Sequence, residues 1–458
     1  MTPKVGSPLF FILFLGLFTS SSFLDLSYIS YLWVGTIFAS FFHTHTYRLQ
    51  TRIFPALIIL SPVFGYISFG FFSLLLSDFY LCLFFIYVAG RSYKSGSVSF
   101  SMILIFLLLF SQIILNYFLG NLDSLKPIVY LFNIFSVILF FRNNPYVEDF
   151  FLSIVHVSCA VVVIMLYFFL KGINISDVSY LSKSGDIKLI ADQSLVEFYV
   201  QPTYFYSNIH YLLGIGILTV IEFLKKKEAV MYNLMILFFL MFGFLIMMNK
   251  TSLISLLLSL LIAYSFTRPF IVLRVVAIFL FGLIFLNYVL EDSYLYLYYL
   301  NRLSGVSSLS ERLVNFLYAL KEFSNYPLSW FFGMGIDFLD SSGESIKTIP
   351  FKRSSFSGDL EVGTIDSAWL SYLIELGLFS FLVILIFMLI KIKSQMNLIK
   401  KHSIFSFGFQ IYIYMFISML TQMIGYSKVA LIIISTLVML ESMMLFKSSN
   451  SVIKSSVN

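Results

Sequence analysis

The segment NRLSGVSSLSER (residues 301–312) opens the one long polar excursion in this chain, and the segment IDSAWLSYLIELGL (residues 365–378) closes it. Apolar runs flank the excursion on both sides, and the chain is 59% hydrophobic and 11% charged, with a mean hydropathy of +0.94. A soluble globular domain carries about 25% charged residues. The composition therefore predicts a polytopic membrane protein, in which this excursion connects two membrane-spanning segments.

The apolar runs predict transmembrane helices. Backbone groups in hydrocarbon must be satisfied within their own segment, as they are in a helix, and about 20 residues cross the bilayer. We therefore expect an all-α polytopic membrane protein with about 14 transmembrane helices, folded as a single integral membrane domain over residues 1–458. The run 53–89 is too long for one span, and Ser68-Phe69-Gly70 is its expected break. The runs are centred near residues 16, 34, 60, 81, 108, 133, 160, 214, 239, 258, 279, 379, 414 and 437.

The distribution of Lys and Arg predicts the orientation of these helices. With a cytoplasmic N-terminus, the cytoplasmic connections contain most basic residues of the short loops, including Lys225-Lys226-Lys227. The short connections on the opposite side contain only Lys126, Lys250 and Lys428. This asymmetry follows the positive-inside rule. We therefore expect both termini in the cytoplasm, with two long loops, 171–206 and 291–365, outside the cytoplasmic membrane.

The charged residues and cysteines argue against several classes of function. The chain carries 29 Lys and Arg against 23 Asp and Glu, but it has no basic stripe of the kind that binds nucleic acid. Cys82 and Cys159 fall in apolar segments, which argues against a disulfide framework or a thiolate metal site. The sequence has no phosphate-binding Gly-rich loop, no HExxH motif and no credible cluster of metal ligands. Its chemistry is therefore expected to use arginines, hydroxyls and carboxylates, without a metal or cofactor.

The large loop contains candidates for binding a phosphate-linked substrate. Ser308 and Glu311 fit a capping box, and the apolar residues that follow at helical spacing predict a surface helix near 309–323. Arg312 lies in the first turn of that helix, where a bound anion would offset the unfavourable dipole. Pairing with Glu311 or with a lipid headgroup is the alternative. Arg302 is a second candidate, although interfacial arginines often extend to lipid headgroups.

Further candidates lie near other membrane boundaries. Lys250, within Asn249-Lys250-Thr251-Ser252, is a candidate phosphate contact at a helix start. Asn208 and His210 lie where the chain leaves the first external loop, and His210 is either a hydrogen-bonded structural residue or a catalytic one. Tyr299 belongs to a tyrosine cluster before the large loop, which either forms an interfacial aromatic belt or stacks against sugars.

Two carboxylates mark the return of the chain to the membrane. Asp366 is a candidate general base or hydroxyl-orienting group. It is alternatively an N-cap for a helix that begins at Ser367 or Ala368. Glu375 falls within a predicted span, where an ionisable residue indicates function by default; a structural role facing the helix bundle is the alternative.

Taken in order, these motifs resemble the O-antigen ligase and polymerase superfamily, and most closely the Wzy-type O-antigen polymerases. The resemblance covers about residues 200–390. Asp366 stands where the ligases carry His, and Lys250 stands where relatives often carry Arg, so it lacks the bidentate guanidinium fork. The matching motifs are Asn208, Lys250-Thr251-Ser252, Arg302…Ser310-Glu311-Arg312, Pro327…Gly333-Met334-Gly335, Asp366-Ser367 and Glu375-Leu376-Gly377.

The resemblance implies a glycosyltransferase of lipopolysaccharide or surface polysaccharide biosynthesis in the bacterial inner membrane, with its active site facing the periplasm. It implies metal-independent, inverting transfer of the growing chain from undecaprenyl diphosphate to a hydroxyl of the next lipid-linked repeat unit. A polysaccharide chain-length regulator is an expected partner. The residues so implicated are Arg302, Arg312 and Lys250 for the diphosphate, Asp366 and His210 for catalysis, and Asn208, Ser310 and Tyr299 for the sugars.

Three alternatives remain open from the sequence. An O-antigen ligase differs from a polymerase in its acceptor. A polysaccharide flippase would place charges along a cavity within the spans, whereas this chain concentrates them in an external loop. A structural or scaffolding membrane protein is the third alternative.

Overall fold

The chain forms two compact units, which we describe separately. The first comprises Met1–Phe100, Phe132–Met247 and Ser427–Asn458, and the second comprises Ser101–Leu131 and Met248–Tyr426. The computed structural model describes residues 27–43, 46–60, 66–68, 73–95, part of 106–118, 126–171 except 143, 209–246 except 228, 250–265, 331, 333, 348–353, 356–361, 368–401, 406–421 and 428–455.

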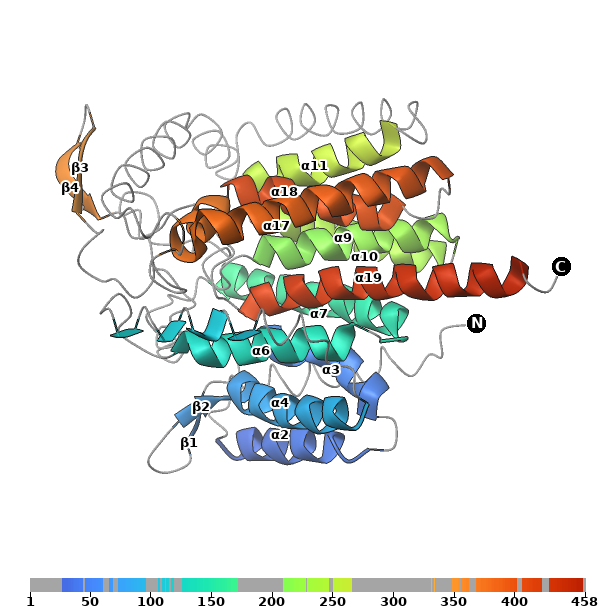
Figure 1. Ribbon diagram of the computed structural model, residues 1–458, viewed down its shortest axis with the longest axis horizontal. Helices are drawn as coiled ribbons and strands as arrows, with labels where there is room; N and C mark the ends of the chain where they lie inside the picture. Colours follow the sequence, from blue (N-terminus) through green and yellow to red (C-terminus); the bar gives the residue numbers. More distant parts are fainter. Residues whose placement is uncertain are drawn as a thin grey trace. The chain divides into compact units, whose positions relative to one another are not determined.

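The first unit is a bundle of helices with one short hairpin (Figure 1). The hairpin is antiparallel and pairs Tyr66 with Leu75 and Ser68 with Ser73. Helix α6 (Lys126–Phe141) contributes its residues from Phe132 onward to this unit. The other elements are α2 (Ser27–Ser40), α3 (Thr46–Leu60), β1 (Tyr66–Ser68), β2 (Ser73–Leu75), α4 (Leu76–Ser95), α7 (Val147–Lys171), α9 (Ile209–Lys225), α10 (Val230–Ile246) and α19 (Lys428–Ser455).

Aromatic side chains form the core between α3, α4 and α6. The ring of Phe54 lies 5.3 Å from that of Phe84 and 5.1 Å from that of Phe141, and all three side chains are fully buried. Tyr80 is buried beside them, and its hydroxyl donates to Oε1 of Gln50 at 3.0 Å. The apolar runs of the sequence thus pack against one another as helices, and a buried phenol within them has its polar partner.

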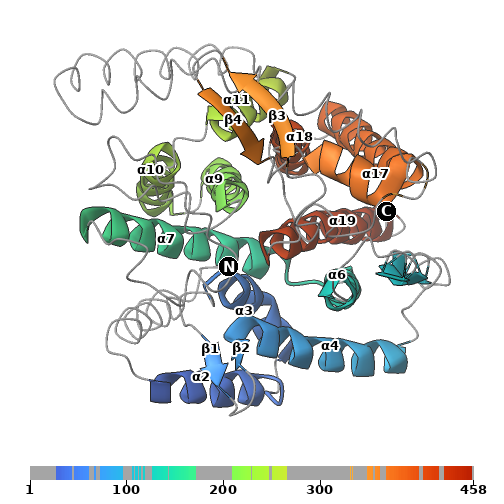
Figure 2. The same ribbon diagram turned by 90° about the vertical axis from the view of Figure 1, so that its left-hand side faces the viewer.

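Glycines allow close packing among α7, α9 and α10, which Figure 2 shows as neighbours. A Cβ atom added at Gly216 of α9 would lie 2.7 Å from Oγ of Ser158 on α7. One added at Gly243 of α10 would lie 2.3 Å from a methyl group of Val162 on α7. Small residues at helix contacts are typical of membrane bundles, where close packing replaces the hydrophobic effect between helices.

The second unit contains α11 (Lys250–Ser265), α17 (Ala368–Lys401), α18 (Ser406–Thr421) and a hairpin of β3 (Thr348–Arg353) and β4 (Phe356–Glu361). Helix α18 packs against both α11 and α17 (Figure 1). Ala263 of α11 and Phe409 of α18 form a small core with Ile392 and Met396 of α17. The indole Nε1 of Trp369 donates to the carbonyl of Phe416 at 3.3 Å and ties the start of α17 to α18.

The helical prediction is confirmed for the described residues, apart from the two short hairpins. The expected break of the long apolar run lies between α3 and α4, where Ser68 ends β1. Among the described residues, one segment, Tyr372–Asn397, is long and apolar enough to cross a membrane, and five further apolar helices have 10–17 residues. Because a span needs about 20 residues, the number of 14 spans stays a prediction. The expected surface helix near 309–323 lies outside the described residues.

Candidate functional site

Two of the eight predicted site residues fall within the described part of the chain, Lys250 and His210. For Lys250 the structure gives the position on the backbone, and for His210 it gives the side chain as well. The six that lie outside the described residues are Asn208, Tyr299, Arg302, Ser310, Arg312 and Asp366.

Lys250 is the first residue of α11, at the helix start that the sequence predicts. The first N–H groups of a helix have no partners within it and favour a nearby anion. The backbone position of Lys250 therefore suits the phosphate contact expected from the sequence.

His210 is the second residue of α9 and belongs to the first unit. Its side chain is 5% exposed, and its ring centroid lies 4.3 Å from that of Tyr211, which is fully buried. A general base must come within hydrogen-bond reach of the hydroxyl that it deprotonates. The enclosure of His210 favours a packing role in this conformation of the protein.

The backbone of Gly333, the first residue of the Gly-x-Gly motif, meets the backbone of α17 at Gly377. A Cβ atom added at Gly333 would lie 2.1 Å from the carbonyl oxygen of Glu375 and 2.6 Å from the amide nitrogen of Gly377. One added at Gly377 would lie 2.4 Å from the carbonyl oxygen of Phe331 and 2.5 Å from the amide nitrogen of Gly333. The backbone of Phe331 and Gly333 therefore touches the backbone of Glu375 and Gly377, and we call this contact the glycine crossing.

Helix α17 is broken at the glycine crossing. Gly377 has φ 78° and ψ 169°, which are not helical values, and Gly333 has φ 73°. Residues with a side chain rarely adopt either conformation, and the region that Gly377 occupies is almost restricted to glycine. The polar groups of an interrupted helix need partners outside it, and in a membrane such backbone occurs where protein or a hydrated cavity surrounds it.

The side chain of Glu375 is fully buried beside this break. Among the described residues it is the only buried Asp, Glu, Lys or Arg. Tyr372, one turn earlier on α17, interacts electrostatically with Glu375 and with Tyr130 near the start of α6. Burying a carboxyl group is costly unless it has polar neighbours, and the phenol of Tyr372 is one such neighbour of Glu375.

The glycine crossing and Glu375 form the candidate site. On α17 they combine the carboxyl group of Glu375, the hydroxyl of Tyr372 and backbone outside a regular helix at Gly377, in contact with Gly333 of the large loop. Such a set can accept or donate hydrogen bonds and can position a hydroxyl group. Within the described residues, no group of three or more His, Cys, Asp or Glu side chains could hold a metal ion.

Sequence reasoning identified both halves of this site but missed their contact. The motifs Gly333-Met334-Gly335 and Glu375-Leu376-Gly377 were each expected, as a turn and as part of a helix. The presence of a glycine in each motif, Gly333 and Gly377, was the sequence feature that could have predicted the contact, because two backbones can approach this closely only where neither carries a Cβ atom.

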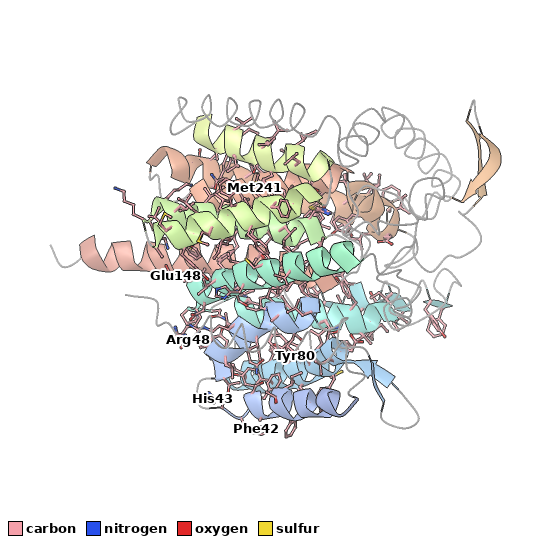
Figure 3. The ribbon with its side chains drawn as sticks, turned by 180° about the vertical axis from the view of Figure 1, so that it is seen from behind. Phe42, His43, Arg48, Tyr80, Glu148 and Met241 are labelled. Atoms are coloured by element: carbon pink, nitrogen blue, oxygen red, sulfur yellow. The ribbon has the colours of Figure 1, made fainter. Side chains whose placement is uncertain are left out.

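A second polar cluster lies in the first unit, at one end of α3 and α7. Nε of Arg48 donates to Asp149 at 2.6 Å, and Nε of Arg52 donates to the same carboxylate at 2.9 Å. Figure 3 shows Arg48 and Glu148 at the same end of the unit, with Tyr80 toward its interior. The two arginines are about half exposed, so this cluster acts as a surface connection between the two helices.

Tyr47 and Arg91 extend this cluster to α4. The guanidinium carbon of Arg91 lies 4.0 Å from the centroid of the Tyr47 ring, and the Tyr47 hydroxyl donates to the carbonyl of Phe140 at 2.7 Å. Burial raises the pKa of Tyr47 to about 12, and the charge of Arg91 opposes that rise. The contacts join α3, α4 and α6 where the sequence predicts a cytoplasmic surface.

Comparison with known proteins adds no relative: no family model matches the chain, and no curated protein matches it.

Proposed function

We propose that this chain is a polymerase of O-antigen or another bacterial surface polysaccharide. In the proposed reaction, a hydroxyl of a lipid-linked repeat unit attacks the anomeric carbon that joins the growing polysaccharide to undecaprenyl diphosphate. The new glycosidic bond forms as the bond to the diphosphate breaks. The diphosphate leaves with the electron pair, and a carboxylate takes the hydroxyl proton.

The glycine crossing is the observation that carries this proposal. It joins Gly333 of the large loop to the break in α17 and lies beside the buried carboxyl of Glu375. In the motif order that resembles the polymerases, the loop supplies Arg302 and Arg312, and α17 follows Asp366. A contact between the loop and this helix is what a polymerase needs to bring diphosphate-binding groups and a carboxylate to one substrate.

The proposal assigns roles by chemistry. Arg302, Arg312 and Lys250 stabilise the charge that develops on the leaving diphosphate, because no metal is invoked to do so. Asp366 accepts the proton of the attacking hydroxyl. Glu375 and its tyrosine neighbour Tyr372 hold the return segment in position.

The proposed topology places these groups at the periplasmic face. It comprises about 14 spans, both termini in the cytoplasm, and the loops 171–206 and 291–365 outside, as the distribution of Lys and Arg predicts. Cysteine labelling from outside the cell is expected at Ser342→Cys and not at Lys226→Cys. External labelling of Lys226→Cys would contradict the orientation.

Lipid-linked intermediates in a deletion strain test the function. Loss of a polymerase is expected to leave single repeat units on undecaprenyl diphosphate at the periplasmic face, and restoring the gene is expected to restore polymer. Accumulation of long chains that remain lipid-linked would identify a ligase instead. If the lipid-linked intermediates and the polymer are unchanged in the deletion strain, the protein is neither a polymerase, nor a ligase, nor a transporter of these intermediates.

A transporter of lipid-linked oligosaccharide is the second candidate, because one observation favours it. Discontinuous helices with ionisable residues inside the span are typical of transporter substrate sites, and α17 combines a break at Gly377 with the buried Glu375. In the same deletion strain, a transporter is expected to leave single repeat units confined to the cytoplasmic face. Their accessibility to an enzyme added outside spheroplasts separates the two functions.

A further inference from the structure

Gln410 of α18 carries a buried amide that the protein does not satisfy. Its side chain is fully buried, and neither Nε2 nor Oε1 has a hydrogen-bond partner among the protein atoms described. A Gln side chain offers two N–H donors and a carbonyl acceptor. Each buried polar group left without a partner costs about 1–3 kcal/mol, so this amide indicates a ligand.

Gln410 is the first of three polar residues along one side of α18. Tyr414 and Ser418 follow at intervals of four residues, which places all three on one face of the helix. Both are fully buried, and the Tyr414 phenol interacts with the Ser418 side chain. The three residues, which we call the polar face of α18, extend over about 12 Å at 1.5 Å per residue.

Gly408 of α18 packs against α17 on another side of the helix. A Cβ atom added at Gly408 would lie 2.9 Å from Oε1 of Gln395 on α17. Positions 408 and 410 differ by about 200° around a helix of 3.6 residues per turn. The amide of Gln395 therefore meets the side of α18 that faces away from Gln410.

The neighbouring helix α11 adds further polar groups to the second unit. It packs against α18, with Ala263 beside Phe409. Its buried residues include Ser252, Ser255 and Ser259, which share one side of the helix. Small polar residues at a helix contact are usual in membrane bundles, so the serines alone would need no ligand.

We infer that the polar face of α18 binds ordered water, held principally by the Gln410 amide. Buried waters typically make about three hydrogen bonds to polar groups that lack other partners, and within the described part of the chain both ends of the Gln410 amide are such groups. The phenol of Tyr414 and the hydroxyl of Ser418 lie on the same face of the helix. Water bound along this face explains why α18 carries a Gln among its buried residues. It also gives the second unit polar groups at depth, which a chain in hydrocarbon tolerates around a hydrated cavity. This inference does not depend on the proposed function.

X-ray radiolytic footprinting of the purified, full-length protein in nanodiscs tests the inference. Hydroxyl radicals formed from a bound water modify side chains next to it, even where bulk solvent has no access. The test compares Tyr414 with Tyr412, because both are fully buried and the two positions lie about 200° apart on α18. We expect Tyr414 to be modified severalfold faster than Tyr412.

The variant Gln410→Leu removes the amide at similar size. It is expected to reduce modification of Tyr414 to the rate of Tyr412, with unchanged modification of exposed residues as evidence of folding. Equal rates for the two tyrosines in the unaltered protein would overturn the inference without recourse to the variant. Undiminished modification of Tyr414 in a folded Gln410→Leu protein would overturn the role of the amide.

Discussion

Alanine at either glycine of the crossing is expected to separate the large loop from α17. At Gly377, with φ 78° and ψ 169°, a side chain costs about 1–3 kcal/mol in backbone strain alone. At Gly333, with φ 73°, the cost of the left-handed conformation is about 1–2 kcal/mol. The new methyl group would also stand 2.1 Å from the carbonyl oxygen of Glu375 at one site and 2.4 Å from that of Phe331 at the other.

These contacts are with backbone atoms, which cannot rotate away as a side chain would. We therefore expect Gly333→Ala and Gly377→Ala each to destabilise the crossing by more than about 2 kcal/mol, the strain and the steric contact together. The consequence for a polymerase is loss of long chains with lipid-linked single units retained, while the rest of the bundle stays folded.

The assay measures polysaccharide chain length on gels beside the amount and melting temperature of the protein in detergent. Gly35→Ala in α2 and Gly90→Ala in α4 are matched controls, because a Cβ atom at either position meets nothing within 4 Å. In a helix, Ala is more favourable than Gly by about 1 kcal/mol, so these controls should not lower stability. Full-length polymer and unchanged melting in Gly377→Ala would refute the reasoning.

Four further experiments, each on substituted protein, test other residues of the chain. Glu375→Gln keeps the shape of the side chain but replaces one carboxyl oxygen by an NH2 donor, so the return segment should be held less well and polymer should fall at unchanged protein level. Normal polymer would show that the carboxyl group of Glu375 is not needed to hold the segment. Asp149→Ala removes a carboxylate that contacts two arginines, each pair worth about 0–1 kcal/mol. The melting temperature should therefore fall slightly, and it should fall less at high salt. Glu148→Ala is the control: the Glu148 side chain is 83% exposed, so its removal should leave the melting temperature unchanged. Arg312→Ala should abolish polymer, and Arg312→Lys should restore it poorly, because Lys lacks the planar fork. Near-normal polymer in the Ala variant would show that Arg312 is a surface charge and does not bind the diphosphate. If Asp366 is the general base, Asp366→Asn should slow polymerisation by a factor of about 10²–10⁴. Asn caps a helix as well as Asp does, so normal polymer in this variant would show that Asp366 is a helix N-cap and not the base.

The break in α17 shows what the sequence could not predict. Residues 368–391 carry no charged side chain except Glu375 and Lys391, and a single Gly is tolerated in a helix, so the pattern predicts an uninterrupted span. The conformation of Gly377 depends on a contact with Gly333, which lies 44 residues earlier in the chain. Local patterns carry no record of such distant contacts. By contrast, the length of the run 53–89 alone required a break, and that break was predicted correctly.

The hairpin of β3 and β4 was missed for a different reason. Residues 348–361 belong to the polar excursion, which was treated as loop apart from its surface helix. Two six-residue strands separated by two residues are a hairpin signal, but Pro350 inside the first strand weakens it. The hydropathy pattern likewise cannot predict that the buried amide of Gln410 has no hydrogen-bond partner among the described residues, because this depends on which helices surround it.

Polymerisation by the purified protein tests the central claim most directly. The protein would be reconstituted into proteoliposomes with undecaprenyl-diphosphate-linked repeat units from a strain that lacks it, without added metal and in the presence of chelator. The account predicts lipid-linked chains of increasing length and release of undecaprenyl diphosphate, one molecule for each new glycosidic bond. Repeat units that stay single while the protein moves them across the membrane would contradict a polymerase and identify a transporter.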